Sequence, residues 1–147
     1  FNFTTRRYDL YQLKNLDYCR LIDLKDTYGD HGRVGMFGLK ILKDFIFVDL
    51  FLLSCRILGR YLENWMYNEI KKIQKKLKKK RVIFEYIPTG KNIVTNDFIK
   101  KVKLKKIAFK EMSKINHNKM LKLNKSSYYY EINNSYNNKI IEIYENR

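Results

Sequence analysis

One short segment, residues 54–65 with the sequence SCRILGRYLENW, carries the side chains best suited to chemistry. Cys55 stands next to Arg56, and Arg60 directly follows Gly59. Two guanidinium groups beside a glycine, where the backbone can approach a ligand closely, suit a phosphate or pyrophosphate anion. The segment therefore indicates either an anion-binding turn or, in the simpler alternative, only the basic cap of a helix.

Cys55 is the candidate catalytic residue. Cationic neighbours and a helix N-terminus favour the thiolate, which can form a thioester with an acyl group. The alternative is a small buried hydrophobic side chain. Cys19 has only Arg20 as a basic neighbour, and we expect it in the core. The two distant cysteines indicate neither a disulfide framework nor a zinc site, so we expect no metal ligands and a reducing, cytoplasmic location.

Other polar and aromatic residues have both a functional and a structural explanation. His31, in the segment GDHGR, is a candidate general base beside Asp30, although an exposed turn residue is the simpler interpretation. Glu63 falls in the first turn of the following helix, where the helix dipole favours a carboxylate. Trp65 and Met66 share the apolar spacing of that helix, so we expect them in the core.

The elements that position these residues follow from hydrophobic periodicity. Apolar side chains recur every three or four residues from 62 to 77, which predicts an amphipathic helix directly after the segment of interest. Alternating or continuous apolar runs predict strands. The predicted order is a short helix within 4–16, strands within 18–29, 34–42 and 45–53, a helix at 62–77, a strand at 81–87, a short helix capped by Thr95, and strands within 128–133 and 139–145.

Length and charge limit the classes of function. A chain of 147 residues suits one globular domain, and the order of elements is α+β. The net charge of +16 is compatible with nucleic acid, anionic lipid or an acidic protein as partner. The excess is mainly lysine, without the interleaved arginine and aromatic residues of nucleic-acid platforms, so we expect no specific nucleic acid. The longest apolar run, residues 45–55, is too short for a membrane span.

Four segments together resemble one family in order and spacing. They are FNFTTRRY (1–8), YGDHGRVGMF (28–37), DLFLLSCRILGR (49–60) and YIPTGKN (86–92). They closely resemble the C-terminal region of FkbH-like proteins, enzymes of the haloacid-dehalogenase superfamily, subfamily IIIC. The resemblance covers mainly residues 1–92, and residues 111–147 diverge.

The resemblance implies a fold and a missing neighbour. It implies that residues 1–147 form a single GNAT-like domain, an α+β fold in three layers with a central mixed sheet flanked by helices. It also implies a phosphatase-like domain upstream of residue 1. Because the chain has no D-x-D-x-T/S motif, we expect the magnesium chemistry of that domain to lie outside this sequence.

The same resemblance implies an activity. Relatives transfer a glyceryl or similar acyl group from a phosphorylated donor to an acyl carrier protein, as in the pathway to methoxymalonyl units for polyketides, or in peptide and surface-glycan pathways. The implied cofactor is the phosphopantetheine of the carrier protein or coenzyme A, and none is expected to be resident in this chain. The implied partners are the carrier protein and the upstream domain.

The residues of the GNAT-like anion loop can be placed on the sequence. Relatives have Gln/Arg-x-x-Gly-x-Gly/Ala, and Arg56, Gly59 and Tyr61 fall on those positions, with Leu58 and Arg60 between them. Tyr61 departs from the pattern, because it puts a large side chain where relatives have a small one. Glu63 falls on a glutamate that relatives carry after the loop.

A second family segment is less well kept. Asn92 falls on an asparagine of the relatives, but Ile99 replaces the tyrosine that usually acts as general acid. Two hypotheses therefore stay open. The chain is an acyltransferase domain that acts on a carrier protein, or it is a degenerate, non-catalytic module that stabilises the phosphatase-like domain or docks a carrier.

Overall fold

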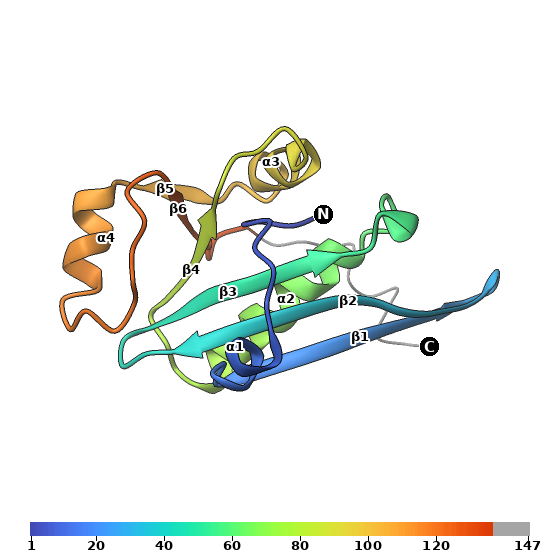
Figure 1. The fold of residues 1–147 in the computed structure, drawn as a ribbon, viewed down its shortest axis with the longest axis horizontal. Coiled ribbons are helices and arrows are strands. Elements are labelled where there is room, and N and C mark those ends of the chain that lie inside the picture. The colour runs from blue at the N-terminus through green and yellow to red at the C-terminus, as the bar shows by residue number, and fades with distance from the viewer. Residues whose placement is uncertain (137–147) are drawn as a thin grey trace.

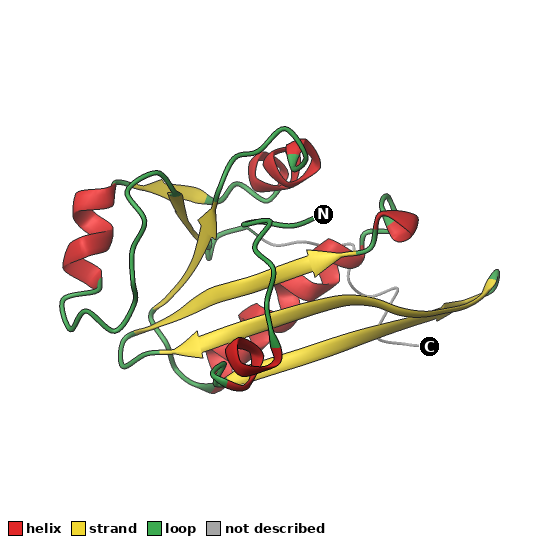
Figure 2. Ribbon diagram, viewed as in Figure 1, coloured by secondary structure: helices red, strands yellow, loops and turns green. Residues whose placement is uncertain are grey.

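The computed structural model describes residues 1–136, and it confirms a mixed α+β fold (Figures 1 and 2). The predicted strand at 139–145 lies outside these residues. The elements are α1 (Leu10–Lys14), β1 (Tyr18–Asp26), β2 (Gly29–Ile41), β3 (Phe45–Leu53), the 3-10 turn η1 (Cys55–Ile57), α2 (Leu62–Lys76), β4 (Arg81–Tyr86), α3 (Ile93–Lys101), β5 (Lys105–Ile107), α4 (Phe109–Ile115) and β6 (Tyr128–Glu131).

The strands form one sheet in the order β1-β2-β3-β4-β6-β5. Only β3 and β4 run parallel, because α2 returns the chain to the same end of the sheet, and the other neighbours are antiparallel. Figure 1 shows α2 on the face of the sheet opposite the N-terminal segment and α1. Among the described residues, no helix is long and apolar enough to cross a bilayer.

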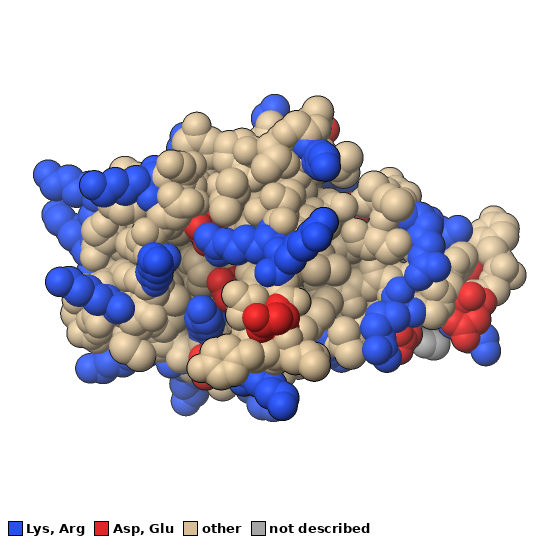
Figure 3. Space-filling view, in the orientation of Figure 1, with Lys and Arg blue, Asp and Glu red and all other residues tan. Residues whose placement is uncertain are grey.

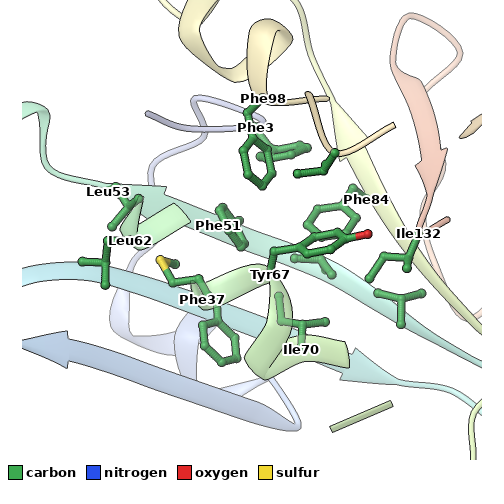
Figure 4. Packing of buried hydrophobic residues seen from close by; sticks show 14 of the residues in the cluster. Phe3, Phe37, Phe51, Leu53, Leu62, Tyr67, Ile70, Phe84, Phe98 and Ile132 are labelled. Atoms are coloured by element: carbon green, nitrogen blue, oxygen red, sulfur yellow. The ribbon is translucent and has the colours of Figure 1, made fainter. Parts of the chain in front are cut away.

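The main core lies between the sheet and α2 (Figure 4). Phe37, Phe51 and Phe84 from three adjacent strands meet Met66 and Ile70 of the helix, and all five side chains are at most 1% exposed. Burying an apolar side chain of this size contributes about 1.5–3 kcal/mol relative to leaving it exposed. This packing is the physical reason that the 62–77 periodicity correctly predicts α2.

A second, smaller cluster covers the opposite face of the sheet. Successive residues of a strand point to opposite faces, so β3 and β4 bury side chains on both, which explains their continuous apolar runs. Phe47 and Ile83 there meet Met112 of α4 and Tyr129 of β6. Neither β5 nor α4 is predicted from the sequence, because each is short and has few apolar positions.

Three sequence expectations are wrong in detail. Cys19 is exposed rather than in the core, because it lies on the edge strand β1. Strand β2 begins at Gly29 instead of residue 34, since a tight turn at residues 27 and 28 and a register shift beside Gly32, which has positive φ, extend the hairpin. Thr95 is not the cap of α3: Asn92 occupies that position, and Thr95 is fully buried inside the helix.

Candidate functional site

The loop between β3 and α2 is shaped by two residues in the left-handed backbone region. Gly59 has φ +84° and Tyr61 has φ 60°. A glycine adopts this conformation without steric cost, whereas a tyrosine there is uncommon. Tyr61 is the N-cap residue of α2, and its carbonyl accepts hydrogen bonds from the N–H groups of Asn64 (3.0 Å) and Trp65 (3.2 Å). The predicted turn therefore does lead directly into a helix N-terminus.

A pocket of about 720 Å³ lies beside this turn. Its walls are residues 22–28 of β1 and the following turn, together with Gly59, Arg60, Tyr61 and the first part of α2. Tyr61 is 44% exposed, and the Lys101 ammonium nitrogen lies 4.5 Å from the centre of its ring. Three of the predicted anion-loop residues thus share one open pocket.

Arg60 is already paired with a carboxylate of the chain. It donates a hydrogen bond to Asp26, and the same carboxylate lies 3.0 Å from Nε2 of His31 and accepts the N–H of Tyr28 at 2.8 Å. Partial burial disfavours the ionised carboxyl, but the hydrogen bonds from His31 and Tyr28 and the charge of Arg60 outweigh it. Together they lower the pKa of Asp26 below its ordinary value.

His31 differs from both sequence interpretations. It is half-buried in β2 and faces Asp26, so it is neither an exposed turn residue nor a base beside Asp30. The polar partner comes from the other arm of the β1–β2 hairpin, which the sequence order alone does not indicate. The cluster of Asp26, His31 and Arg60 connects this hairpin to the anion loop.

The remaining loop residues have different exposures. Cys55 is exposed at the start of η1, so the alternative that it is a buried hydrophobic side chain is wrong. Arg56 is exposed and donates from Nη2 to the carbonyl oxygen of Arg33 at 3.0 Å, which attaches the loop to β2. Leu58 is half-buried. Glu63 lies in the first turn of α2, and its buried Oε2 has no hydrogen-bond partner among residues 1–136.

Strands β3 and β4 part close to this loop, and the chain itself fills the gap. Their last parallel pair is Val48 with Phe84. Beyond it, the carbonyl of Phe1 accepts the N–H of Leu53 at 2.9 Å, and that of Phe3 accepts the N–H of Ile87 at 3.0 Å. Residues 1–3 therefore pair with both separated strands, as an added strand does.

Phe3 joins the segment in the gap, residues 1–3, to the main hydrophobic core. It is 2% exposed, and its ring lies 5.5 Å from that of Phe51, 5.0 Å from that of Phe84 and 6.4 Å from that of Phe98 (Figure 4). Aromatic rings at such separations attract each other beyond the area that they bury. An extended ligand such as a pantetheine arm does not fit between β3 and β4 while residues 1–3 lie there.

Asn92 supports the filled gap and does not line the pocket beside Gly59. Its Nδ2 donates to the carbonyl of Ile87 at 2.8 Å, and its Oδ1 accepts the N–H of Thr89 at 2.8 Å. The Thr95 hydroxyl donates to the carbonyl of Asn2 at 3.1 Å. Because Asn92 is 2% exposed and its amide has backbone partners, the structure gives it a clear structural role.

A cluster of charged residues lies where β3 and β4 separate, and it was not predicted from the sequence. Arg6 binds Glu85 with both terminal nitrogens, at 2.7 and 2.9 Å, and the Ser127 hydroxyl donates to Glu85 at 2.6 Å. Asp49 lies 3.9 Å from Arg6 and 3.5 Å from the Lys40 ammonium. Asp49 and Glu85 directly follow the last β3–β4 pair. A single acid in each of two apolar strands is the signal that could have found them.

The described residues hold no cluster suited to a metal ion: nowhere in 1–136 do three His, Cys, Asp or Glu side chains come together for one. The site is thus an exposed thiol, a left-handed basic turn and an adjoining pocket. These features lie where a parallel strand pair opens at the start of a helix. This arrangement defines the class of fold as GNAT-like.

Comparison with known proteins supports this fold class. A domain from Methanocaldococcus jannaschii is similar with a TM-score of 0.57 at 16% identity, over 78% of this chain and 65% of that domain. A GNAT family acetyltransferase from Elizabethkingia anophelis, solved with acetyl-CoA bound, is similar with a TM-score of 0.51 at 10% identity, over 90% of this chain and 95% of that one. Such identities show the fold alone, and the predicted GNAT-like fold is confirmed.

The amino-acid sequence itself has no match among known families or curated proteins. The chain spans 65% of the length of the Methanocaldococcus jannaschii domain. A GNAT-like fold is therefore established, and an activity of this chain is a matter for proposal.

Proposed function

We propose that this chain is the acyltransferase-like domain of an FkbH-like protein and assists transfer of a glyceryl or related acyl group to an acyl carrier protein. The observation that carries the proposal is the loop after β3. It presents an exposed Cys55 and Arg56, and it turns at Gly59 into the N-terminus of α2 beside an open pocket. The motif resemblance of residues 1–92 supplies the substrate class.

The chemistry proposed for the loop has two parts. The phosphate of the carrier's phosphopantetheine binds at the start of α2, where backbone N–H groups and the helix dipole favour an anion. Arg56 and Arg60 add charge, and the phosphate competes with Asp26 for Arg60. Because the gap between β3 and β4 is filled, the arm approaches through the pocket on the β1 side.

Cys55 is the proposed transient acyl acceptor. Its thiolate attacks the carbonyl carbon of an acyl-phosphate donor, the bond from that carbon to the phosphate oxygen breaks, and inorganic phosphate leaves. The thiolate of the carrier then attacks the resulting thioester, and the carbon–sulfur bond to Cys55 breaks to restore the free thiolate. The upstream phosphatase-like domain, with its magnesium, and a cytoplasmic location belong to the same proposal.

Titration with phosphopantetheinylated carrier protein tests the anion loop. We expect the Arg56→Ala and Arg60→Ala variants to bind roughly tenfold more weakly than wild type, because each removes a charge-assisted contact to phosphate. Arg7→Ala is the matched control, since Arg7 is an exposed arginine outside the loop. Equal binding by wild type and both loop variants overturns the phosphate site.

Acyl trapping tests the thioester. Incubation with a labelled acyl donor should leave label on wild type that hydroxylamine removes, and Cys55→Ser should carry none of this labile label. Cys19→Ser is the control, because Cys19 is also exposed but lies on β1. Labile label that persists in Cys55→Ser excludes this cysteine as the acceptor.

A second candidate function has its own support. The filled gap and the bulky Tyr61 favour a non-catalytic GNAT-like module that stabilises the phosphatase-like domain or docks a carrier. For a full-length protein, this candidate predicts normal acyl transfer in Cys55→Ser. It also predicts a lower unfolding temperature of the phosphatase-like domain when residues 1–147 are deleted. Loss of transfer in Cys55→Ser with an unchanged unfolding temperature argues against it.

A further inference from the structure

One end of the molecule carries an uncompensated lysine surface. Residues 105–125, which we call the lysine end, contain seven lysines and one carboxylate, Glu111. Glu111 is already paired with Arg81 at 3.0 Å. Figure 3 shows basic side chains gathered at the end that carries α4 in Figure 1. All of these lysines are exposed: Lys105, Lys106, Lys110, Lys114, Lys119, Lys122 and Lys125.

An apolar groove of about 490 Å³ opens within this end. It lies between the chain that follows α4 and the β2–β3 hairpin, and its apolar walls include Leu42, Phe45, Ile115 and Leu121. Met120 also lines the groove and is 72% exposed. A flexible exposed methionine beside an apolar groove is a common feature of surfaces that bind amphipathic helices.

The groove has more cationic than anionic surroundings. Lys40 and Lys43 line it from the hairpin, and its other wall is formed by residues between 115 and 121, with Lys114, Lys119 and Lys122 next to them in sequence. The acids that line it are Asp17, which accepts the N–H of Ile41 at 2.7 Å, and Asp44 at the hairpin tip. An apolar groove beside a surface with an excess of lysines matches a partner with an apolar face flanked by acids.

We propose that the lysine end and this groove dock the acyl carrier protein through an acidic, amphipathic helix. One apolar side chain of that helix enters the groove beside Met120, and its carboxylates face the lysines. The identity of the partner rests on the proposed function, whereas the docking surface rests on the charge and the groove. All seven cationic side chains of residues 105–125 are lysines, and an apolar groove beside them suits a protein side chain better than a phosphate backbone.

The groove and the anion loop are close enough for one carrier protein to contact both. Strand β3 runs from the groove at Phe45 to the anion loop after Leu53, and nine extended residues span about 30 Å. This length is about the diameter of a small domain. A carrier held at the groove and lying along the sheet can therefore direct its phosphopantetheine toward the loop. Docking and phosphate recognition are separate in this arrangement.

Binding of carrier protein with and without its phosphopantetheine tests the proposal. We expect the unmodified carrier to bind wild type at low salt, and Lys110→Glu/Lys114→Glu to weaken this binding roughly tenfold or more, with a shallower dependence on salt. Lys75→Glu/Lys76→Glu on α2 changes the net charge equally and is the matched control, expected to lose no more than about twofold. Met120→Glu should weaken binding similarly, because it puts a charge in the apolar contact.

Different results would overturn the docking surface and the phosphate site at the anion loop. Arg56→Ala should reduce only the extra affinity that phosphopantetheine provides, and it should leave binding of the unmodified carrier unchanged. If Lys110→Glu/Lys114→Glu and the α2 control weaken binding equally, the docking surface is wrong and the attraction is nonspecific. It is also wrong if random duplex DNA alone is bound through these lysines, or if Met120→Glu only abolishes self-association seen by light scattering. Circular dichroism verifies that every variant is folded.

Discussion

Arg6 donates a hydrogen bond from each of its two terminal guanidinium nitrogens to a different carboxylate oxygen of Glu85, at 2.7 and 2.9 Å. The two residues are 79 positions apart, and the pair connects the N-terminal segment to β4. Glu85 is 2% exposed, and its carboxylate oxygens accept hydrogen bonds from Arg6 and from the Ser127 hydroxyl. The pair holds the chain where residues 1–3 continue into the gap between β3 and β4.

Loss of this pair should destabilise the fold. Arg6→Ala leaves the buried Glu85 charge without its cation, and we expect it to lower the free energy of unfolding by about 3 kcal/mol. Replacing both residues, Arg6→Met with Glu85→Leu, should cost less than Arg6→Ala alone. Urea unfolding followed by circular dichroism measures both, with Arg7→Ala as control. A loss below about 1 kcal/mol would show that the pair is not needed to hold the segment.

Phe3 is expected to be as important as a residue of a central strand. Phe3→Ala removes a ring that is 2% exposed and contacts several other rings, and we expect a loss of about 3–5 kcal/mol in the free energy of unfolding. Leu10→Ala is the control: Leu10 is 77% exposed, so its change should stay within about 0.5 kcal/mol. Similar small effects of both variants would contradict the core role of residues 1–3.

The contact between Asp26 and Arg60 should make stability depend on acid pH. The folded pKa of Asp26 is lowered: burial opposes ionisation, but the His31 hydrogen bond and the Arg60 charge prevail. The ionised carboxylate therefore contributes stability above its unfolded pKa of about 3.9, and this contribution is lost as the pH falls through the lower folded pKa.

Thermal unfolding of wild type and Asp26→Asn from pH 2 to 7 measures this contribution. The difference in unfolding temperature should be constant above about pH 5 and should shrink below about pH 4. Asp30→Asn is the control, because the Asp30 side chain accepts the N–H of the nearby Gly32 at the start of β2. A difference that does not vary with pH would mean that Asp26 acts through packing and not through its charge.

Removal of the hydroxyl should have different effects on stability at two buried tyrosines, Tyr67 and Tyr129. The Tyr67 hydroxyl is buried without a hydrogen-bond partner among residues 1–136, so Tyr67→Phe should leave stability unchanged or raise it by up to about 1 kcal/mol. The Tyr129 hydroxyl accepts the N–H of Asn124 at 2.8 Å, so Tyr129→Phe should cost about 1 kcal/mol. Chemical unfolding of the two variants measures the contrast, and a larger loss in Tyr67→Phe would contradict it.

Alkaline titration gives an independent measurement on Tyr67. Burial is the main cause that raises its pKa, with a further contribution from Tyr136, so Tyr67 should ionise after the exposed tyrosines. The ultraviolet difference spectrum of Tyr67→Phe should lack the last step of the wild-type curve. If an early step disappears instead, Tyr67 is accessible to solvent.

The candidate site illustrates which features a sequence can predict. Gly59, the basic turn and the start of α2 follow from local signals, because a glycine before an amphipathic period marks a turn and a helix wherever the chain folds. The neutralisation of Arg60 by Asp26, and the position of His31 beside both, leave no local signal. They depend on packing of the β1–β2 hairpin against the loop before α2, which brings residues about 30 positions apart into contact.

By itself, the sequence determined the order of the main strands and the long helix, and through four motifs the GNAT-like fold. The elements follow from periodic burial, which each segment carries in its own residues, whereas the GNAT-like fold was implied by the resemblance of the four motifs to a known family. Only the tertiary structure decided that residues 1–3 close the gap between β3 and β4, that Arg6 compensates Glu85 and that Asn92 is structural. These contacts join segments up to about 90 residues apart, and their energy depends on burial that exists only after the chain has folded.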